Sequence, residues 1–137
     1  MTYTLKLVAL ECLQAQEIDG DEIYLKLNDQ RIWASDPDKM GAADQPDPLV
    51  SQYDFTEGRR QTRQGWLPIS DYQSEQFVFR NQSGDGVLQL WEADPLTRDD
   101  LLGQTPLSEQ QAVGGTIAVV FQRSGAHYRL TYQIEIE

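Results

Sequence analysis

The chain has 137 residues, of which 39% are hydrophobic and 24% are charged, and its formal net charge is −11 at pH 7. Length and composition predict one globular domain, residues 1–137, with a sizeable core. Because an acidic surface repels the phosphates of nucleic acids and anionic lipids, the charge excludes passive binding to DNA, RNA or membranes and favours cations.

The sequence also bears on the cellular compartment. No apolar run approaches the roughly 18 residues of a membrane-spanning helix, and the N-terminus lacks the charged and apolar regions of a signal peptide. The single cysteine, Cys12, excludes an internal disulfide, and its apolar neighbours predict a buried structural thiol. These features together predict a cytoplasmic protein.

The first third of the chain predicts short strands. Residues 4–13 are strand-like, but the apolar parity changes at Val8, which indicates a β-bulge or a strand covered on both faces. Residues 23–28 alternate cleanly between apolar and polar side chains. A tight turn at Asn28-Asp29 then leads to a short returning strand over 31–33, which predicts a β-hairpin.

The middle of the chain has weaker signals. Residues 34–48 have the Asp, Pro, Gly and Ala content of a loop, which is long for a compact domain. Weak strand patterns at 49–55 and 66–69 flank the polar stretch 57–65. That stretch contains the one basic cluster of the chain, which favours a solvated turn over a phosphate site: Arg59, Arg60 and Arg63.

The last part of the chain has the clearest strands. Residues 76–80 and 87–91 flank the turn sequence 81–86 and predict a hairpin. The near-continuous apolar run 116–122 is typical of a strand inside a sheet, and residues 128–136 alternate as a half-buried strand does. With seven to nine short strands and no amphipathic helix, the sequence predicts an all-β fold, an antiparallel β-sandwich of about eight strands.

An oxygen-rich stretch follows the strand predicted at 87–91. It extends from Glu92 to Gly103, and we expect an irregular loop there. Four of its side chains carry oxygens at a spacing that suits one half of a calcium site, because calcium takes six to eight oxygen ligands in flexible loops. These side chains are Glu92, Asp94, Thr97 and Asp100.

The stretch resembles the third calcium-binding loop of C2 domains, the β-sandwich modules of protein kinase C and synaptotagmin. In that family a strand ends in an Asp-x-Asp pair, followed by a Ser, Thr or Asn and then by an Asp before an apolar pair and a glycine. The resemblance places the ligand positions on Glu92, Asp94, Thr97 and Asp100, with a glutamate where the family usually has an aspartate. Leu101, Leu102 and Gly103 match the structural end of the motif.

The first calcium-binding loop of the family precedes a strand similar to Tyr24-Leu-Lys-Leu27. Its proximal acidic position corresponds to Glu22, with Asp21 beside it, and its distal position corresponds to Gln16, which is not acidic. A small shift in register brings other acids of this loop into the site. The candidate ligands of the first loop are therefore Glu17, Asp19, Asp21 and Glu22.

The resemblance implies a small non-enzymatic binding module with calcium as its ion. Two acidic loops at one end of a sandwich repel each other until a divalent ion lies between them. Calcium would then allow contact with a protein partner, or with a lipid headgroup in a calcium-dependent manner. Two alternatives remain open. Residues 97–103 also fit one capped helical turn, in which case Glu92 and Asp94 simply solvate a strand end. The protein as a whole could instead be a metal-independent structural or assembly protein that uses its sandwich surface or edges.

Enzymatic functions have little support in the sequence. His127 is the single histidine, and it precedes the last strand without an evident nucleophile or metal-ligand partner. No phosphate loop, dinucleotide fingerprint or Gly-x-Ser-x-Gly motif is present. We therefore expect no enzyme, and a small hydrolase is the weakest of the alternatives.

Overall fold

The structure is a computed structural model that describes residues 1–45 and 49–137. The long loop predicted over 34–48 therefore falls partly outside the described residues. Within them, no helix is long or apolar enough to cross a membrane. The elements are β1 (Thr2–Gln14), β2 (Ile23–Leu27), β3 (Gln30–Ala34), β4 (Gln52–Asp54), β5 (Arg59–Thr62), β6 (Gly65–Pro68), β7 (Val78–Ser83), β8 (Gly86–Glu92), β9 (Asp100–Leu107), the 3-10 helix η1 (Glu109–Gln111), β10 (Thr116–Arg123) and β11 (Ala126–Ile136).

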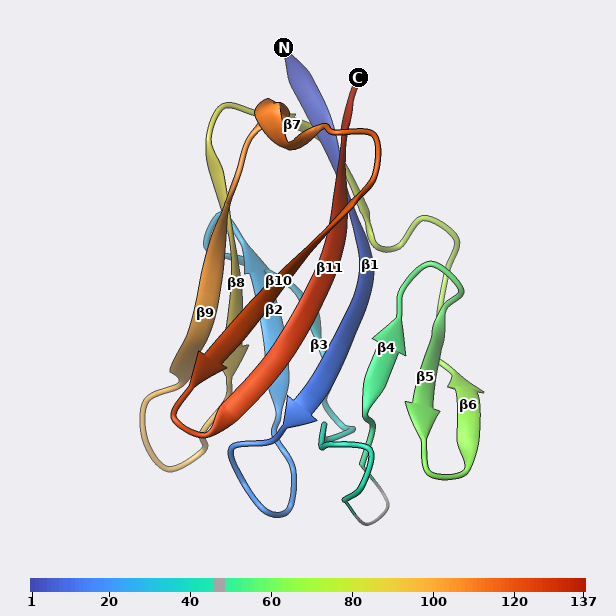
Figure 1. The fold of residues 1–137 in the computed structure, drawn as a ribbon, viewed down its shortest axis with the longest axis vertical. Helices are drawn as coiled ribbons and strands as arrows, with labels where there is room; N and C mark the ends of the chain where they lie inside the picture. The colour runs from blue at the N-terminus through green and yellow to red at the C-terminus, as the bar shows by residue number, and fades with distance from the viewer. Residues whose placement is uncertain (46–48) are drawn as a thin grey trace.

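The strands form two antiparallel sheets that pack face to face (Figure 1). The larger sheet has the order β10-β11-β1-β4-β5-β6, with β7 also paired to β1, and the smaller sheet has the order β3-β2-β8-β9. This confirms the predicted antiparallel β-sandwich. The described residues contain eleven strands instead of about eight, because the middle of the chain adds short strands that have weak sequence patterns.

Strand β1 is the centre of the larger sheet, and its predicted bulge is present. The register against β11 shifts between Leu7 and Ala9. On the other side of β1, β4 and β7 lie end to end at the same place: Phe55 N donates to Val8 O at 2.9 Å, and Leu7 N donates to Phe77 O at 3.0 Å. The rings of Phe55 and Phe77 are 4.6 Å apart. β4 and β7 therefore share one strand position beside β1, and the chain between them forms the β5–β6 hairpin.

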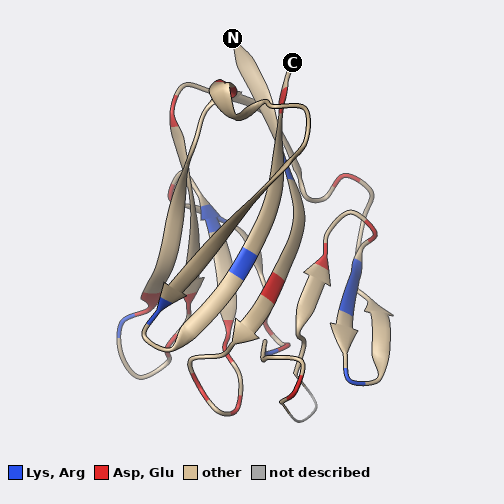
Figure 2. Ribbon diagram, viewed as in Figure 1, with Lys and Arg blue, Asp and Glu red and all other residues tan. Residues whose placement is uncertain are grey.

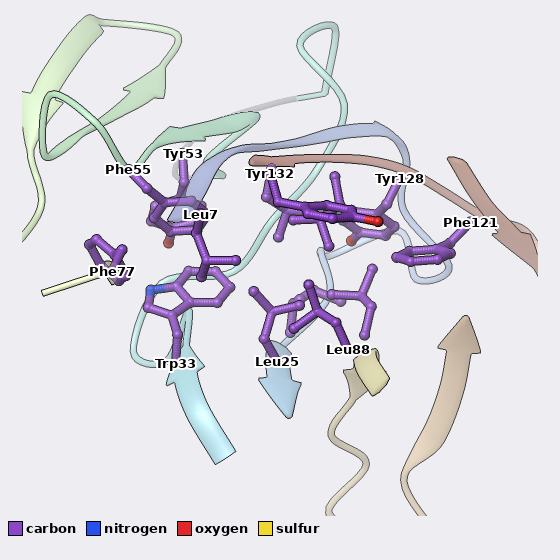
Figure 3. Packing of buried hydrophobic residues seen from close by; sticks show 14 of the residues in the cluster. Leu7, Leu25, Trp33, Tyr53, Phe55, Phe77, Leu88, Phe121, Tyr128 and Tyr132 are labelled. Carbon is purple, nitrogen blue, oxygen red and sulfur yellow. The ribbon is translucent and has the colours of Figure 1, made fainter. Parts of the chain in front are cut away.

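The core lies between the two sheets (Figure 3). Alternate side chains of β11, including Tyr128 and Tyr132, point inward against Leu25 of β2 and Leu88 of β8, and all four are fully buried. Burial of this kind is the main favourable contribution to folding. Cys12 also belongs to the core, and its burial raises the pKa of the thiol to about 12. The predicted structural thiol is confirmed.

The predicted hairpin of β2 and β3 is present, but one other predicted pairing is wrong and one strand was missed. Residues 76–91 do not form a hairpin, because β7 pairs with β1 in the larger sheet while β8 pairs with β2 and β9 in the smaller one. The turn between them, with Gly84 at φ +68°, passes from one sheet to the other. Residues 57–65 were expected as a polar separator, but they contain β5, whose Arg59 and Arg60 form ion pairs with Asp54 and Asp38.

The apolar strand β10 is not in the interior of a sheet. It is an edge strand of the larger sheet, and its outward residue Val120 is 56% exposed. Its apolar character has another cause: Phe121 packs against Gly103 of β9 in the smaller sheet, and the guanidinium of Arg123 donates to Leu101 O of β9 at 2.9 Å. β10 therefore closes one side of the sandwich.

Candidate functional site

The two acidic stretches of the sequence meet at one end of the sandwich, opposite the termini (Figure 1). The first acidic loop is residues 15–22, after β1, and the second acidic loop is residues 93–99, between β8 and β9. Ala93 N donates to Glu22 O at 2.8 Å, and Gln16 Nε2 lies 3.4 Å from Asp100 Oδ2. Figure 2 shows Asp and Glu along the loops at this end. The predicted proximity of the two loops is therefore present.

The second acidic loop is shorter than predicted. Asp100 already belongs to β9, where it pairs with Glu92 of β8, so that the irregular segment ends at Asp99 and not at Gly103. Leu101 and Leu102 are strand residues, so the alternative of a capped helical turn over 97–103 is wrong. Gly103 does not end the loop but allows the ring of Phe121 to lie directly on β9.

Glu92 is the most unusual side chain of this end. It is the last residue of β8 and is only 2% exposed, and its Oε2 has no hydrogen-bond partner among the described residues. Burial, followed by the charges of Asp21, Glu17, Asp100 and Asp94 in that order, raises the pKa of its carboxyl group to about 8. Both acidic loops therefore act electrostatically on one buried carboxyl group.

Asp21 is also fully buried, but its carboxylate is well bonded. Tyr128 Oη donates to its Oδ2 at 2.6 Å, and the backbone N–H groups of Gln16 and Glu17 donate at 2.9 and 3.0 Å. Burial raises the pKa of Asp21, although these three hydrogen bonds lower it in part. Asp21 thus holds the first acidic loop against the core.

Asp94 and Thr97 bond to each other within the second acidic loop. Asp94 Oδ1 accepts from the N–H groups of Leu96 and Thr97 at 2.9 and 3.3 Å, and Thr97 Oγ1 donates to Asp94 Oδ2 at 2.8 Å. The N–H of Leu96 is the main reason why the pKa of Asp94 is lowered. This is the local turn that a short acidic side chain commonly forms.

The remaining acids of the first loop have different surroundings. Asp19 is exposed and lies 3.6 Å from the Lys39 ammonium. Glu17 is exposed, and Glu22 is half-buried with its backbone oxygen bound to Ala93. Among the described residues, no three His, Cys, Asp or Glu side chains are grouped closely enough to hold a metal ion. The eight proposed ligands therefore share one end of the molecule but are not gathered around one point, and the calcium site stays a prediction.

Asp99 is a residue that the sequence reasoning missed. Its Oδ2 accepts from Tyr24 Oη at 2.5 Å and its Oδ1 accepts from Asp94 N at 3.0 Å. The hydrogen bond from Tyr24 is the main cause of its lowered pKa. Tyr24 in turn is stacked near Trp91, with ring centroids 6.3 Å apart. The motif spacing selected the neighbouring Asp100, so the sequence contained no signal for Asp99.

Comparison with known proteins gives a likeness of fold alone. No protein-family model matches the chain, and no curated protein matches it. Among solved structures, the chain is similar to one titled "Structure of a C2 domain", with 13% identity, 99% of each chain covered and a TM-score of 0.48. It is also similar to human GIVD cytosolic phospholipase A2 in complex with methyl gamma-linolenyl fluorophosphonate, with 14% identity and a TM-score of 0.40. That match covers 99% of this chain and 17% of the phospholipase chain. The antiparallel β-sandwich itself is shown by the strand pairings of this chain.

Proposed function

We propose that the protein is a non-enzymatic binding module whose two acidic loops take up a calcium ion and thereby change the charge of one end of the sandwich. The observation that supports this is the state of Glu92. A buried carboxyl oxygen without a partner, close to four further acids, is unfavourable in the cation-free chain. A divalent cation would compensate for both the missing contact and the repulsion.

The donors of this end suit a hard cation, because all of them are oxygens and calcium prefers carboxylate, hydroxyl and carbonyl oxygens. Glu92, Asp100 and Glu17 are the best candidates, since the carboxylates of Asp21 and Asp94 already hold their loops together. Two loops must be ordered around the ion, so we expect weak affinity, with a dissociation constant of about 10⁻⁴ to 10⁻³ M.

Thermal unfolding with increasing CaCl₂ tests this proposal. Since the ion binds only the folded chain, a tenfold excess over the dissociation constant stabilises it by about 1.4 kcal/mol. We expect a rise in melting temperature with calcium but not with magnesium, and no rise in Glu92→Gln with Asp100→Asn. Asp85→Asn with Glu109→Gln, which removes two exposed acids of the opposite end, is the matched control and keeps the rise. The absence of a calcium-dependent shift up to several times the expected ~10⁻³ M dissociation constant would sink the proposal.

A second function is favoured by the internal hydrogen bonds of the loops. Asp21, Asp94 and Asp99 each accept from backbone N–H groups, so both loops are ordered without an ion. The alternative proposal on this ground is a metal-independent structural or assembly protein with a preformed acidic end. Size-exclusion chromatography of the protein with its bound partners separates the two functions: a chelator releases partners held through calcium and leaves the others in place.

A further inference from the structure

We propose that the loop end, defined as residues 14–22 and 92–100, docks a basic amphipathic segment of another protein. This inference rests on the protein's being a binding module, but it does not require calcium. It concerns the cation-free chain, in which the charges of the two loops are not neutralised.

The charge of the loop end fits a basic partner. Its two stretches contain eight acidic residues and one basic residue, Arg98. Among the ion pairs of the described residues, the only one that involves these acids joins Asp19 to Lys39 at 3.6 Å. Glu17 and Asp100 are exposed. Complementary charge increases the association rate and excludes partners of the same sign, so nucleic acids and anionic lipids are disfavoured in the cation-free chain.

The loop end is also apolar at its tips. Ile18 in the first acidic loop is 94% exposed and Leu96 in the second is 91% exposed, more than any other large hydrophobic side chain of the described residues. The position of Ile18 is held by its backbone, because Gln45 Nε2 donates to Ile18 O at 3.2 Å. Two exposed apolar side chains next to exposed carboxylates predict a partner that carries both apolar and basic residues.

Glu92 supplies an independent indication of a cationic ligand. Its side chain is buried at the base of the two loops, and its Oε2 has no partner among the described residues. A lysine ammonium or an arginine guanidinium has N–H donors from which such an oxygen can accept, and a hydrogen bond with a charged donor is stronger than one between neutral groups.

The test is binding of a fluorescein-labelled peptide of lysine and leucine, measured by fluorescence anisotropy with the full chain in a chelator. The expected result is saturable binding that weakens with salt. Glu17→Gln with Asp100→Asn should weaken it roughly tenfold, whereas Asp85→Asn with Glu109→Gln at the opposite end should not. Ile18→Ser with Leu96→Ser should also weaken binding, whereas Val113→Ser, which is 69% exposed at the opposite end, should leave it unchanged.

Four outcomes would contradict the inference. Equal losses in the loop-end and opposite-end acid variants would mean that only the overall net charge attracts the peptide. Equal binding of a lysine and serine peptide would remove the role of Ile18 and Leu96. Binding of phosphatidylserine vesicles in the chelator, without peptide binding, would make the partner a membrane. Calcium is added last, to distinguish the two proposals. If calcium changes the melting temperature but no peptide binds in the chelator, the cation proposal survives and this inference fails. If the peptide binds in the chelator but calcium does not change the melting temperature, this inference survives and the cation proposal fails.

Discussion

Tyr128 Oη donates a 2.6 Å hydrogen bond to Asp21 Oδ2, and this bond joins the last strand of the chain to its first acidic loop. Both side chains are fully buried. Because Asp21 also accepts from the N–H groups of Gln16 and Glu17, the position of the loop backbone depends on a residue in the core of the sandwich. The geometry of the loop end is therefore coupled to the stability of the fold.

Tyr128→Phe should destabilise the protein by about 1–3 kcal/mol, because it leaves a buried carboxylate with one donor fewer. Tyr53→Phe is the matched control. Tyr53 is buried like Tyr128, but its hydroxyl has no hydrogen-bond partner in the described chain, so its removal should be neutral or slightly stabilising. Urea denaturation measures both free energies of unfolding. Equal losses in the two variants would show that the bond to Asp21 contributes nothing specific.

Stability should fall as the pH rises from about 5 to 8. The folded-state pKa of Glu92 is about 8, against an ordinary value of 4.5. Between these values the folded chain binds more protons than the unfolded chain, so the stabilising contribution is complete below pH 4.5 and is lost as the pH passes about 8. Each unit of pKa difference corresponds to about 1.4 kcal/mol, and we expect a loss of a few kcal/mol.

Glu92→Gln is the variant that tests this pH dependence, because glutamine does not titrate. Its melting temperature should equal that of the parent near pH 5 and exceed it near pH 8. Burial also raises the pKa of Asp21, so a part of the slope with the same sign should remain in the variant. If parent and variant have parallel melting curves over this range, Glu92 does not titrate as inferred.

The fold was predictable where a pattern is local. The bulge in β1, the turn at Asn28 and Asp29 with φ of 50° and 69°, and the alternation of β11 all have direct sequence signals. The pairing of β2 with β3 followed from its tight turn, but pairings between strands that are distant in sequence have no such signal. The turn around Gly84 has the chemistry of a hairpin, but such residues serve equally in a connection between sheets, and only packing decides which one forms.

The candidate site was predictable as a location but not as a geometry. The spacing of Glu92, Asp94 and Asp100 placed an acidic loop after a strand, which the structure confirms. Where each carboxylate points depends on which donors are near it. Asp94 bonds to N–H groups of its own loop, and Asp21 bonds to a tyrosine 107 residues away in sequence. No local pattern contains that second contact.

Asp99 should stabilise the protein at neutral pH and lose this effect in acid. Its pKa is lowered by the hydrogen bond from Tyr24, so its contribution is present above its ordinary pKa of 3.8 and is lost as the pH falls through the folded-state value. Asp99→Asn should therefore lower the melting temperature at pH 7 and make no difference near pH 2. The exposed Asp44→Asn is the control. An Asp99→Asn deficit that persists unchanged in acid would contradict the ionised hydrogen bond.

Gly103→Ala should destabilise the protein by about 1–3 kcal/mol, because it overfills the contact between β9 and β10. A Cβ at this position would overlap the ring of Phe121 and lie 2.9 Å from its Cβ, so rotation of the ring alone cannot relieve the overlap. Gly115→Ala is the control, since a Cβ there meets nothing within 4 Å. If the overlap is the cause, adding Phe121→Leu should cost less in the Gly103→Ala background than in the parent, which a double-mutant cycle of unfolding free energies measures. Additive losses would place the effect of Gly103 elsewhere in β9.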